Sequence, residues 1–232
     1  MRVNYTVNNI AYSLTRSKRK TAAIYIRDGI VDVRAPLKMP IKEIDKFVSS
    51  KEEWITKKLT LSAQQANRQK RFTLDYGDTV LCRNRPFTIV AQFGDDFWYD
   101  DNNFYMPPGL TPNEIKRGCV RVYTKIAESI IPARAQNFAV LMSVKPAGIR
   151  ISNAKSQWGS CSVKKKINFS WRLVMADDDV IDYVVVHELA HIIEMNHLKK
   201  FWGIVGNVIP DFKARKIRLK ELQQRLSGEN WV

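Results

Sequence analysis

The sequence predicts an α+β fold in which a β-rich amino-terminal region with helices precedes a more helical second half. Short β-type runs bounded by Gly, Asn and Asp turns recur through residues 1–110. Residues 111–232 instead hold long stretches whose apolar residues recur at helical spacing. Pro107-Pro108-Gly109 separates the two patterns, so we place a domain boundary there, between 1–110 and 111–232. The two regions can still pack as one unit.

The amino-terminal region predicts strands at 12–14, 22–27 and 30–34, with Asp28-Gly29 as a hairpin turn. We therefore expect a small β-meander. Helical spacing begins at Ile41, and Ser50-Lys51-Glu52-Glu53 predicts a capping box for a second helix that reaches about Gln69. Four short β-type runs follow, at 79–82, 86–93, 97–99 and 104–106.

The second half predicts a helix over about 112–143, which Pro132 is expected to kink or divide. Two strand-like pieces then follow Gly148, joined by Lys164-Lys165-Lys166. In the second piece, Ile167, Phe169, Trp171 and Leu173 alternate with polar residues, which is typical of a half-buried strand. Asp177, Asp178 and Asp179 are expected to cap the next helix.

Composition limits the class of protein. The 232 residues are 45% hydrophobic, which is enough for a sizeable core. No apolar run approaches the length of a membrane span, and the amino terminus lacks the apolar run of a signal peptide. The three cysteines, Cys82, Cys119 and Cys161, are far apart and odd in number, which argues against a disulfide framework. We expect a cytoplasmic protein with reduced thiols and no membrane partner.

The net charge of +15 is unevenly distributed. Residues 1–70 hold 15 basic and 6 acidic residues, whereas residues 177–197 hold six acidic and no basic ones. The basic region can contact nucleic acid weakly, although a solvated basic face is the simpler explanation.

All three histidines fall within His187–His197, in the sequence HELAHIIEMNH. His187 and His191 are four residues apart, so on a helix they lie about 40° from each other and can bind one ion, for which zinc is expected. His197 lies roughly 240° further round a straight helix, so the chain must turn first. Asn196 is the expected turning point, because Asn tolerates left-handed backbone angles.

Glu188 follows the first histidine and points near the apolar stripe of its helix, where a nearby cation would compensate its charge. The pattern predicts one zinc ion on His187, His191 and His197 with an open position for water, and Glu188 as the base. Glu194 can orient a metal-binding histidine through a hydrogen bond, or it can replace His197 as the third ligand. Histidines that are merely polar residues near a helix end are the plain alternative.

Three further side chains are candidate oxyanion or substrate contacts: Tyr183, Arg172 and Asn168. Tyr183 precedes His187 by four residues on nearly the same helical face. Arg172 and Asn168 lie on the open face of the predicted strand before the metal helix, and an extended peptide can pair with an exposed strand edge there. A structural tyrosine and an ordinary half-buried strand remain the alternatives.

Several segments together resemble the YgjP-like family of zinc metallopeptidases: Trp158-Gly159-Ser160-Cys161-Ser162, Asn168-Phe169-Ser170-Trp171-Arg172-Leu173, Ile181-Asp182-Tyr183 before HELAH, and Asn196-His197 before Phe201-Trp202. The resemblance implies a zincin-like metallopeptidase core, with the three histidines as ligands and Glu188 as the catalytic carboxylate. Gln157 and Leu198 depart from the family's usual residues. Gln157 stands in place of an expected arginine and can alter substrate contacts.

Three functions remain under comparison. The leading one is a zinc hydrolase that cleaves peptide bonds in peptide or protein substrates. The second is a DNA-associated protease similar to SprT-like proteins, which would use the basic amino-terminal region. The third is a non-enzymatic, zinc-stabilised module that binds nucleic acid. A structural zinc site usually recruits cysteines and leaves no task for Glu188, which disfavours the third.

Overall fold

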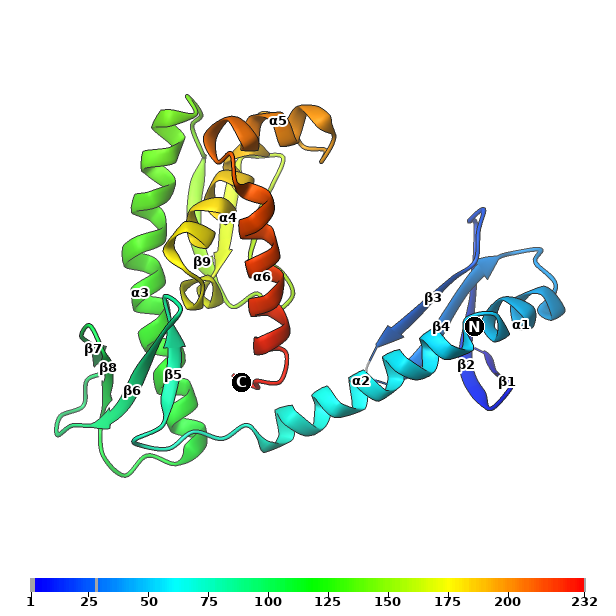
Figure 1. The fold of residues 1–232 in the computed structure, drawn as a ribbon, viewed down its shortest axis with the longest axis horizontal. Coiled ribbons are helices and arrows are strands. Elements are labelled where there is room, and N and C mark those ends of the chain that lie inside the picture. The colour runs from blue at the N-terminus through cyan, green and yellow to red at the C-terminus, as the bar shows by residue number, and fades with distance from the viewer. Residues whose placement is uncertain (1–2, 28, 232) are drawn as a thin grey trace. The chain divides into compact units, whose positions relative to one another are not determined.

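The chain divides into two structural units in the computed structural model, which describes residues 3–27 and 29–231 (Figure 1). The first unit comprises Met1–Phe72 and Ser227–Glu229, and the second comprises Thr73–Leu226 and Asn230–Val232. Strands and helices occur in both, so the fold is α+β, as the sequence predicts. No helix within the described residues is long and apolar enough to cross a membrane.

The first unit is a four-stranded sheet with two helices. Its strands are β1 (Val3–Val7), β2 (Ile10–Ser17), β3 (Ala23–Arg27) and β4 (Ile30–Pro36), and its helices are α1 (Ile41–Ser49) and α2 (Glu52–Arg71). The strand order is β1-β2-β4-β3, with β2 parallel to β4, so the expected simple meander is wrong. Asp28 of the predicted hairpin turn lies outside the described residues.

The core of this unit forms where helix and sheet meet. Alternation places Tyr12 and Leu14 of β2 on the buried side, and Ile44 and Val48 of α1 pack in the same cluster with Ile55 of α2. The predicted capping box is absent. Helix α2 has Lys51 as its N-cap without a side-chain bond, and the Ser50 hydroxyl donates to the Phe47 carbonyl at 2.8 Å instead.

The second unit begins with a sheet of strands β5 (Thr79–Cys82), β6 (Arg85–Ala91), β7 (Trp98–Tyr99) and β8 (Asn103–Met106), in the order β5-β6-β8-β7. All four lie close to the predicted runs. The expected boundary after residue 110 differs from the observed division at 72/73. The cause is contact with later segments: the Arg83 amide donates to the Val174 carbonyl at 2.7 Å, and the Tyr123 hydroxyl donates to the Leu81 carbonyl at 2.7 Å.

The long helix α3 (Pro112–Leu141) supports the rest of this unit (Figure 1). Thr111 and Glu114 form a capping box at its start. Pro132 lies inside one continuous helix and does not divide it. The neighbouring Ile131 and Ala135 are fully buried, so tertiary packing offsets the hydrogen bond that Pro132 cannot donate.

A three-stranded sheet follows, with β10 (Gly159–Cys161) and β9 (Gly148–Ser152) on either side of β11 (Lys166–Ser170). The predicted strand therefore ends three residues early, at Ser170, and Trp171–Met175 forms a 3-10 helix, η1. The Ser170 side chain caps this turn by accepting from the Arg172 amide at 3.4 Å. The alternation extended the predicted strand too far because Trp171 and Leu173 are buried in the 3-10 helix, as a half-buried strand would also bury them.

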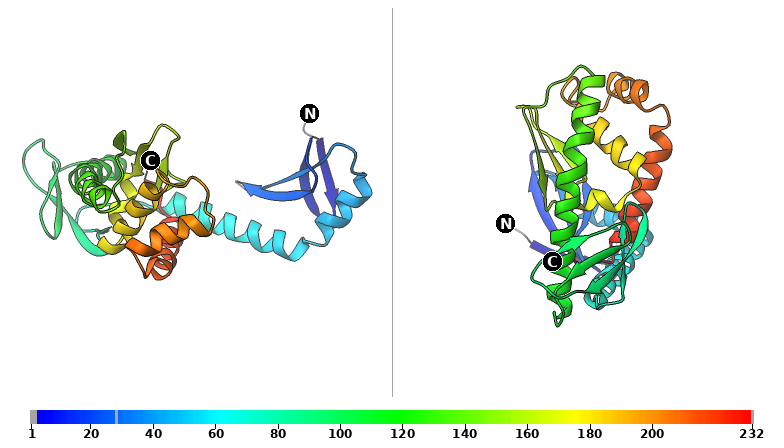
Figure 2. Two further views of the ribbon diagram at one scale, coloured as in Figure 1. Left: turned by 90° about the horizontal axis from the view of Figure 1, so that it is seen from above. Right: turned by 90° about the vertical axis from the view of Figure 1, so that its left-hand side faces the viewer.

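Three helices complete the unit: α4 (Asp178–Ala190), α5 (Lys199–Val208) and α6 (Phe212–Leu226). Helix α4 is the central one, and it contacts α3, α5, α6 and β10 (Figure 2). Asp177 is the N-cap residue but makes no side-chain cap bond, so the expected side-chain cap is absent, whereas Asp178 and Asp179 lie in the first turn, where the helix dipole favours them. These carboxylates bind arginines of neighbouring elements instead.

Candidate metal centre

The carboxyl end of α4 positions the first two histidines. Helix α4 ends at Ala190, and His191 is its C-cap with right-handed angles, so His187 and His191 keep the i, i+4 relation of one helical face. The chain then turns, as required, over residues 191–194, where the Glu194 amide donates to the Ala190 carbonyl at 2.9 Å. Asn196 does not have a positive φ, so the predicted left-handed turn at that residue is wrong.

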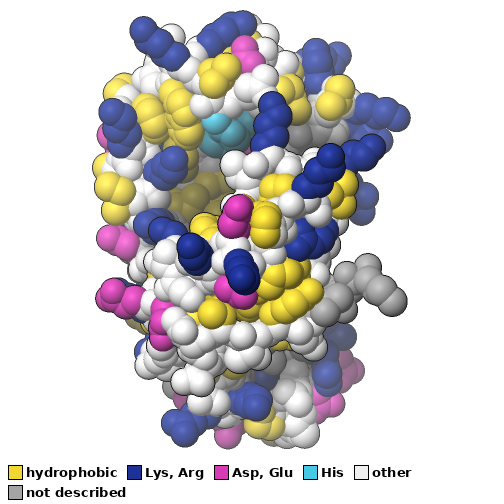
Figure 3. Space-filling view, turned by 90° about the vertical axis from the view of Figure 1, so that its right-hand side faces the viewer, with side chains coloured by type: hydrophobic (Ala, Val, Ile, Leu, Met, Phe, Trp, Pro, Cys, Tyr) yellow, Lys and Arg dark blue, Asp and Glu magenta, His cyan; other side chains and the backbone are white. Residues whose placement is uncertain are grey.

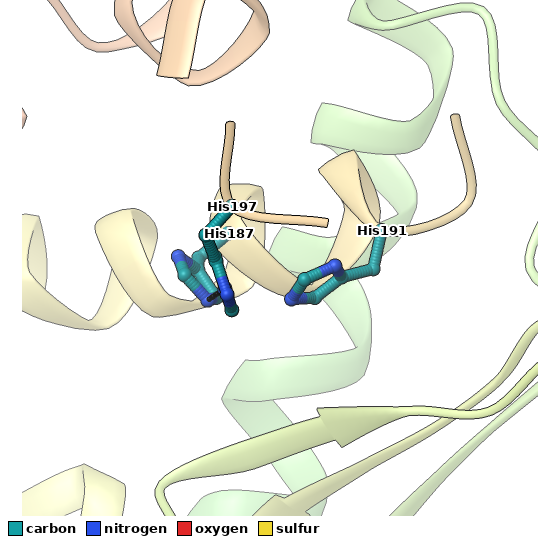
Figure 4. Close-up of side chains that lie close together, drawn as sticks. All are labelled: His187, His191 and His197. Atoms are coloured by element: carbon teal, nitrogen blue, oxygen red, sulfur yellow. Dashed lines mark hydrogen bonds between the residues drawn. The ribbon is translucent and has the colours of Figure 1, made fainter. Parts of the chain in front are cut away.

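The turn brings His197 back over His187. Their Nε2 atoms lie 3.1 Å apart, and one ring nitrogen from each of the three histidines falls within 4.8 Å of the others. Figure 4 shows the three rings pointing toward a common region. Ligand nitrogens of a tetrahedral zinc site stand about 3.3 Å apart, given zinc–nitrogen bonds of about 2.0–2.1 Å. The spacing and the nitrogen donors thus fit one divalent ion with little adjustment.

Packing and hydrogen bonds orient these rings. Nδ1 of His191 lies 3.2 Å from the Glu194 carbonyl, and donation there leaves Nε2 with its lone pair for a metal. The Phe201 ring of α5 packs on all three imidazoles, with centroid distances of 4.9, 4.6 and 4.6 Å. Nδ1 of His187 is buried without a hydrogen-bond partner in the described part of the chain. An aromatic wall therefore backs the cluster.

The environment keeps two of the imidazoles neutral. Burial, together with the smaller effects of the neighbouring His191, His197 and Lys216, lowers the pKa of His187 to about 3. Burial also lowers the pKa of His191. Neutral imidazoles present the lone pairs that metal coordination requires.

Glu188 lies beside this cluster, on the side that faces β10. The residue is 6% exposed, and burial raises the pKa of its carboxyl to about 7. Tyr183 lies one turn earlier on α4, with its ring 5.9 Å from that of His187. Burial and then the Glu188 charge raise the pKa of Tyr183 to about 12, so its phenol remains a proton donor.

These groups share one cavity of about 450 Å³. Besides the histidines, Glu188 and Tyr183, its lining consists of residues from the β10 region, α4, the turn after it and α6: Gln157, Trp158, Gly159, Ser160, Cys161, Val184, Met195 and Leu219. Figure 3 shows a histidine side chain reaching the surface close to hydrophobic side chains. Among the described residues that line the cavity, Glu188 is the only one of the aspartate, glutamate, lysine or arginine type.

Two of the candidate contacts lie elsewhere. The Arg172 guanidinium donates to the Asn153 side chain at 2.8 Å and stacks over Trp171, with its carbon 4.2 Å from the ring centroid. Asn168 sits in the central strand β11, between Ser160 of β10 and Arg150 of β9. Neither residue lines the cavity, and β11 has no free edge. The edge strand beside the cavity is β10.

Glu194 contributes through its backbone. Its carbonyl is the group beside His191, whereas its carboxylate lies 3.4 Å from the Lys200 ammonium and accepts from the Asn196 amide at 3.4 Å. The cluster of three potential ligands does not include it.

Sequence reasoning missed the opposite wall of the cavity. Gly159 and Cys161 come from β10, and Leu219 comes from α6, at sequence distances where periodicity carries no information. The family resemblance alone singles out the segment Trp158–Ser162. The tertiary contact between β10 and α4 places this segment in the cavity wall.

The chain belongs to the YgjP-like family: the metallopeptidase domain of that family matches residues 20–222. Membership makes the protein a metal-dependent hydrolase that acts on peptide substrates and implies a divalent metal.

Two solved structures are similar to part of the chain, both described as crystal structures of metallopeptidase zymogens. Jannalysin of Methanocaldococcus jannaschii is 25% identical over 40% of this chain and 95% of its own, with a TM-score of 0.36. Abylysin of Pyrococcus abyssi is 22% identical over 42% of this chain and 91% of its own, with a TM-score of 0.34. A comparison with curated proteins found no match.

Proposed function

We propose that this chain is a zinc-dependent metallopeptidase that binds one ion through His187, His191 and His197 and cleaves peptide bonds with Glu188 as general base. The observation that carries the proposal is the convergence of three ring nitrogens within 4.8 Å beside a buried carboxyl in an open cavity. Neutral imidazoles without a cysteine in the set favour zinc with a free coordination position. Zinc supplies Lewis acidity there, since it polarises a carbonyl and lowers the pKa of water to about 7.

The protein's own groups perform the proton transfers. A Glu188 carboxylate oxygen accepts a proton from the attacking water and delivers it to the nitrogen of the leaving amine. The cavity wall around Glu188 is apolar on the Val184 and Leu219 sides, which limits competing water. The Tyr183 phenol makes no hydrogen bond within the described residues, and it lines the cavity. It is free to donate to the oxygen that gains charge as the carbonyl is attacked.

The substrate's main chain is held by the edge of β10. The amides of Ser170 and Ser162 donate to the carbonyls of Trp158 and Lys166 at 2.9 Å each, so residues 158 and 162 bond toward β11. Antiparallel alternation then directs the N–H and C=O of Gly159 and Cys161 away from β11. A peptide added as a further strand pairs with these groups next to Glu188.

The test joins a metal analysis to an unbiased peptide-cleavage profile of wild type and Glu188→Gln. We expect about one zinc per chain in both proteins and at least about a 100-fold loss of hydrolysis in the variant, because the base is removed while the ligands remain. Equal cleavage by the two proteins would show that Glu188 is not the base. Bound zinc without any cleavage by wild type would instead favour a non-enzymatic zinc module.

A further inference from the structure

Gly159 lies against the Glu188 side chain. A Cβ atom built on Gly159 would stand 2.6 Å from Cγ, 2.8 Å from Oε1 and 2.9 Å from Cδ of Glu188. These separations are far below ordinary carbon contacts of about 3.5–4.0 Å. Any side chain at residue 159 would therefore require the carboxyl group or the strand to move.

The need for glycine comes from this space and not from the backbone. Four glycines, Gly29, Gly77, Gly94 and Gly109, have positive φ, and Gly159 is not among them. An L-residue could adopt the backbone angles of Gly159. Close approach to Glu188 is the remaining reason for glycine at this position.

Neither the backbone of β10 nor that of α4 can move easily. Behind Gly159, β11 holds the strand through the bond from the Ser170 amide to the Trp158 carbonyl, and Phe169, which lies opposite Gly159, is fully buried. On the other side, Glu188 belongs to α4, where Val185 and Leu189 are fully buried as well. With both backbones fixed by packing, the side chain of Glu188 is the part that would move, toward the cavity and the histidines.

We propose that Gly159 is the positioning residue for Glu188, because the bare backbone of β10 forms the rear wall that fixes the carboxyl group. This inference rests on the proposed function of Glu188. The same close approach places the outward-pointing main-chain groups of Gly159, where the substrate strand pairs, beside the base. One glycine thus sets the distance between the held peptide and the group that takes the proton.

The kinetic test is Gly159→Ala with Gly148→Ala as the matched control. Gly148 starts β9 of the same sheet, and a Cβ there meets nothing within 4 Å. We expect Gly159→Ala to keep its metal and a near wild-type KM while kcat falls on the order of 100-fold, as for a group misplaced by about 1 Å. Gly148→Ala should match wild type in all three quantities. Unchanged kcat in Gly159→Ala would overturn the proposal.

A double-mutant cycle tests the contact without any activity measurement. Gly159→Ala should lower the unfolding temperature by roughly 3–10 °C in the wild-type background and by much less in the Glu188→Ala background, where the overlapping atoms are gone. An equal loss in both backgrounds would overturn the contact with Glu188. Should Gly159→Ala fail to fold, recovery of a folded protein in Gly159→Ala/Glu188→Ala supports the proposal, and failure there too overturns it. If wild type proved inactive, this cycle would still decide the packing role.

Discussion

His197 is the side chain whose role most needs a direct test, because Glu194 was an alternative third ligand. The structure favours His197: its Nε2 lies 3.1 Å from that of His187, while the Glu194 carboxylate faces Lys200 and the Asn196 amide. We expect His197→Ala to lose metal affinity strongly and Glu194→Ala to keep stoichiometric zinc, since the Glu194 backbone carbonyl near His191 survives the change. Zinc titration of the two purified variants measures this. The reverse pattern would show that the third ligand is misassigned.

Substitution of Tyr183 distinguishes a catalytic role of its phenol from a packing role of its ring. If its phenol donates to the developing oxyanion, Tyr183→Phe should lower kcat by about 10- to 100-fold and leave the zinc content and unfolding temperature unchanged. Steady-state kinetics on a validated peptide give the answer. Tyr99→Phe, which removes a phenol outside the cavity lining, is the control. Wild-type kcat in Tyr183→Phe would reduce Tyr183 to a structural tyrosine.

Single residues were predictable where the chemistry is local. The spacing of His187 and His191 predicted a shared helical face, and the structure has it. The contact of Gly159 with Glu188 joins positions 29 residues apart, and no local pattern encodes such a distance. The turn predicted at Asn196 forms earlier in the chain, through hydrogen bonds to the carbonyls of Leu189 and Ala190.

Among the elements, α4 depends on ion pairs at its amino end as well as on its buried face. The Arg134 guanidinium bridges Asp178 at 2.9 Å and Asp182 at 2.6 Å, so α3 is tied to the first turn of α4. Arg83, in the turn between β5 and β6, also binds Asp178, and Arg218 of α6 binds Asp179. This network holds the end of α4 opposite the histidines.

The network predicts a pH-dependent stability. Hydrogen bonds from Arg83, aided by the charges of Arg134 and Arg83, lower the pKa of Asp178 below its unfolded value of about 3.9. The stabilisation is therefore fully present above about pH 4 and is lost as the pH falls through the lowered pKa. Because the side chain is 43% exposed, we expect Asp178→Asn to cost less than about 1 kcal/mol at pH 7.

Urea unfolding of wild type and Asp178→Asn between pH 7 and pH 2 measures this difference. The gap between their free energies of unfolding should narrow as the pH drops below about 4. Asp96→Asn, in the exposed loop between β6 and β7, should show no gap at any pH. A gap for Asp178→Asn that persists unchanged at pH 2 would contradict an electrostatic origin.

The same aspartates show why some elements were misread from sequence. Their position at a helix start predicted capping, but an arginine within reach is a stronger partner than a backbone amide, and the arginines come from β5–β6, α3 and α6. Ser170 shows the opposite case, where a local cap ended a strand that alternation extended to Leu173. Element types were predictable from period and turn residues, whereas ends depend on such side-chain bonds.

At the scale of the whole chain, the basic residues gather in the amino-terminal region. Residues 1–70 hold 15 basic against 6 acidic residues, and Lys57 and Lys58 lie exposed on α2. Among the described residues of this unit, the exposed large aromatic side chains are Tyr25 on β3 and Trp54 on α2. Tyr25 alternates with Ile24 and Ile26, which pack against the core, so it lies on the other face of the sheet and is not paired with Trp54 in the closely spaced stacking platform of a single-strand binder. We therefore propose only weak, charge-driven contact with nucleic acid.

Titrations of labelled single- and double-stranded DNA, with wild type and with Lys57→Gln/Lys58→Gln, test this proposal. Binding should be measurable near 50 mM salt and fall steeply toward roughly 200 mM, because neutralised phosphates release their counterions. If α2 makes the contact, the double variant should bind all sequences more weakly, with a salt slope reduced by about one to two. A wild-type dissociation constant below a micromolar at physiological salt, together with proteolysis that DNA stimulates, would contradict weak contact. It would make the protein a DNA-associated protease, as in the SprT-like alternative.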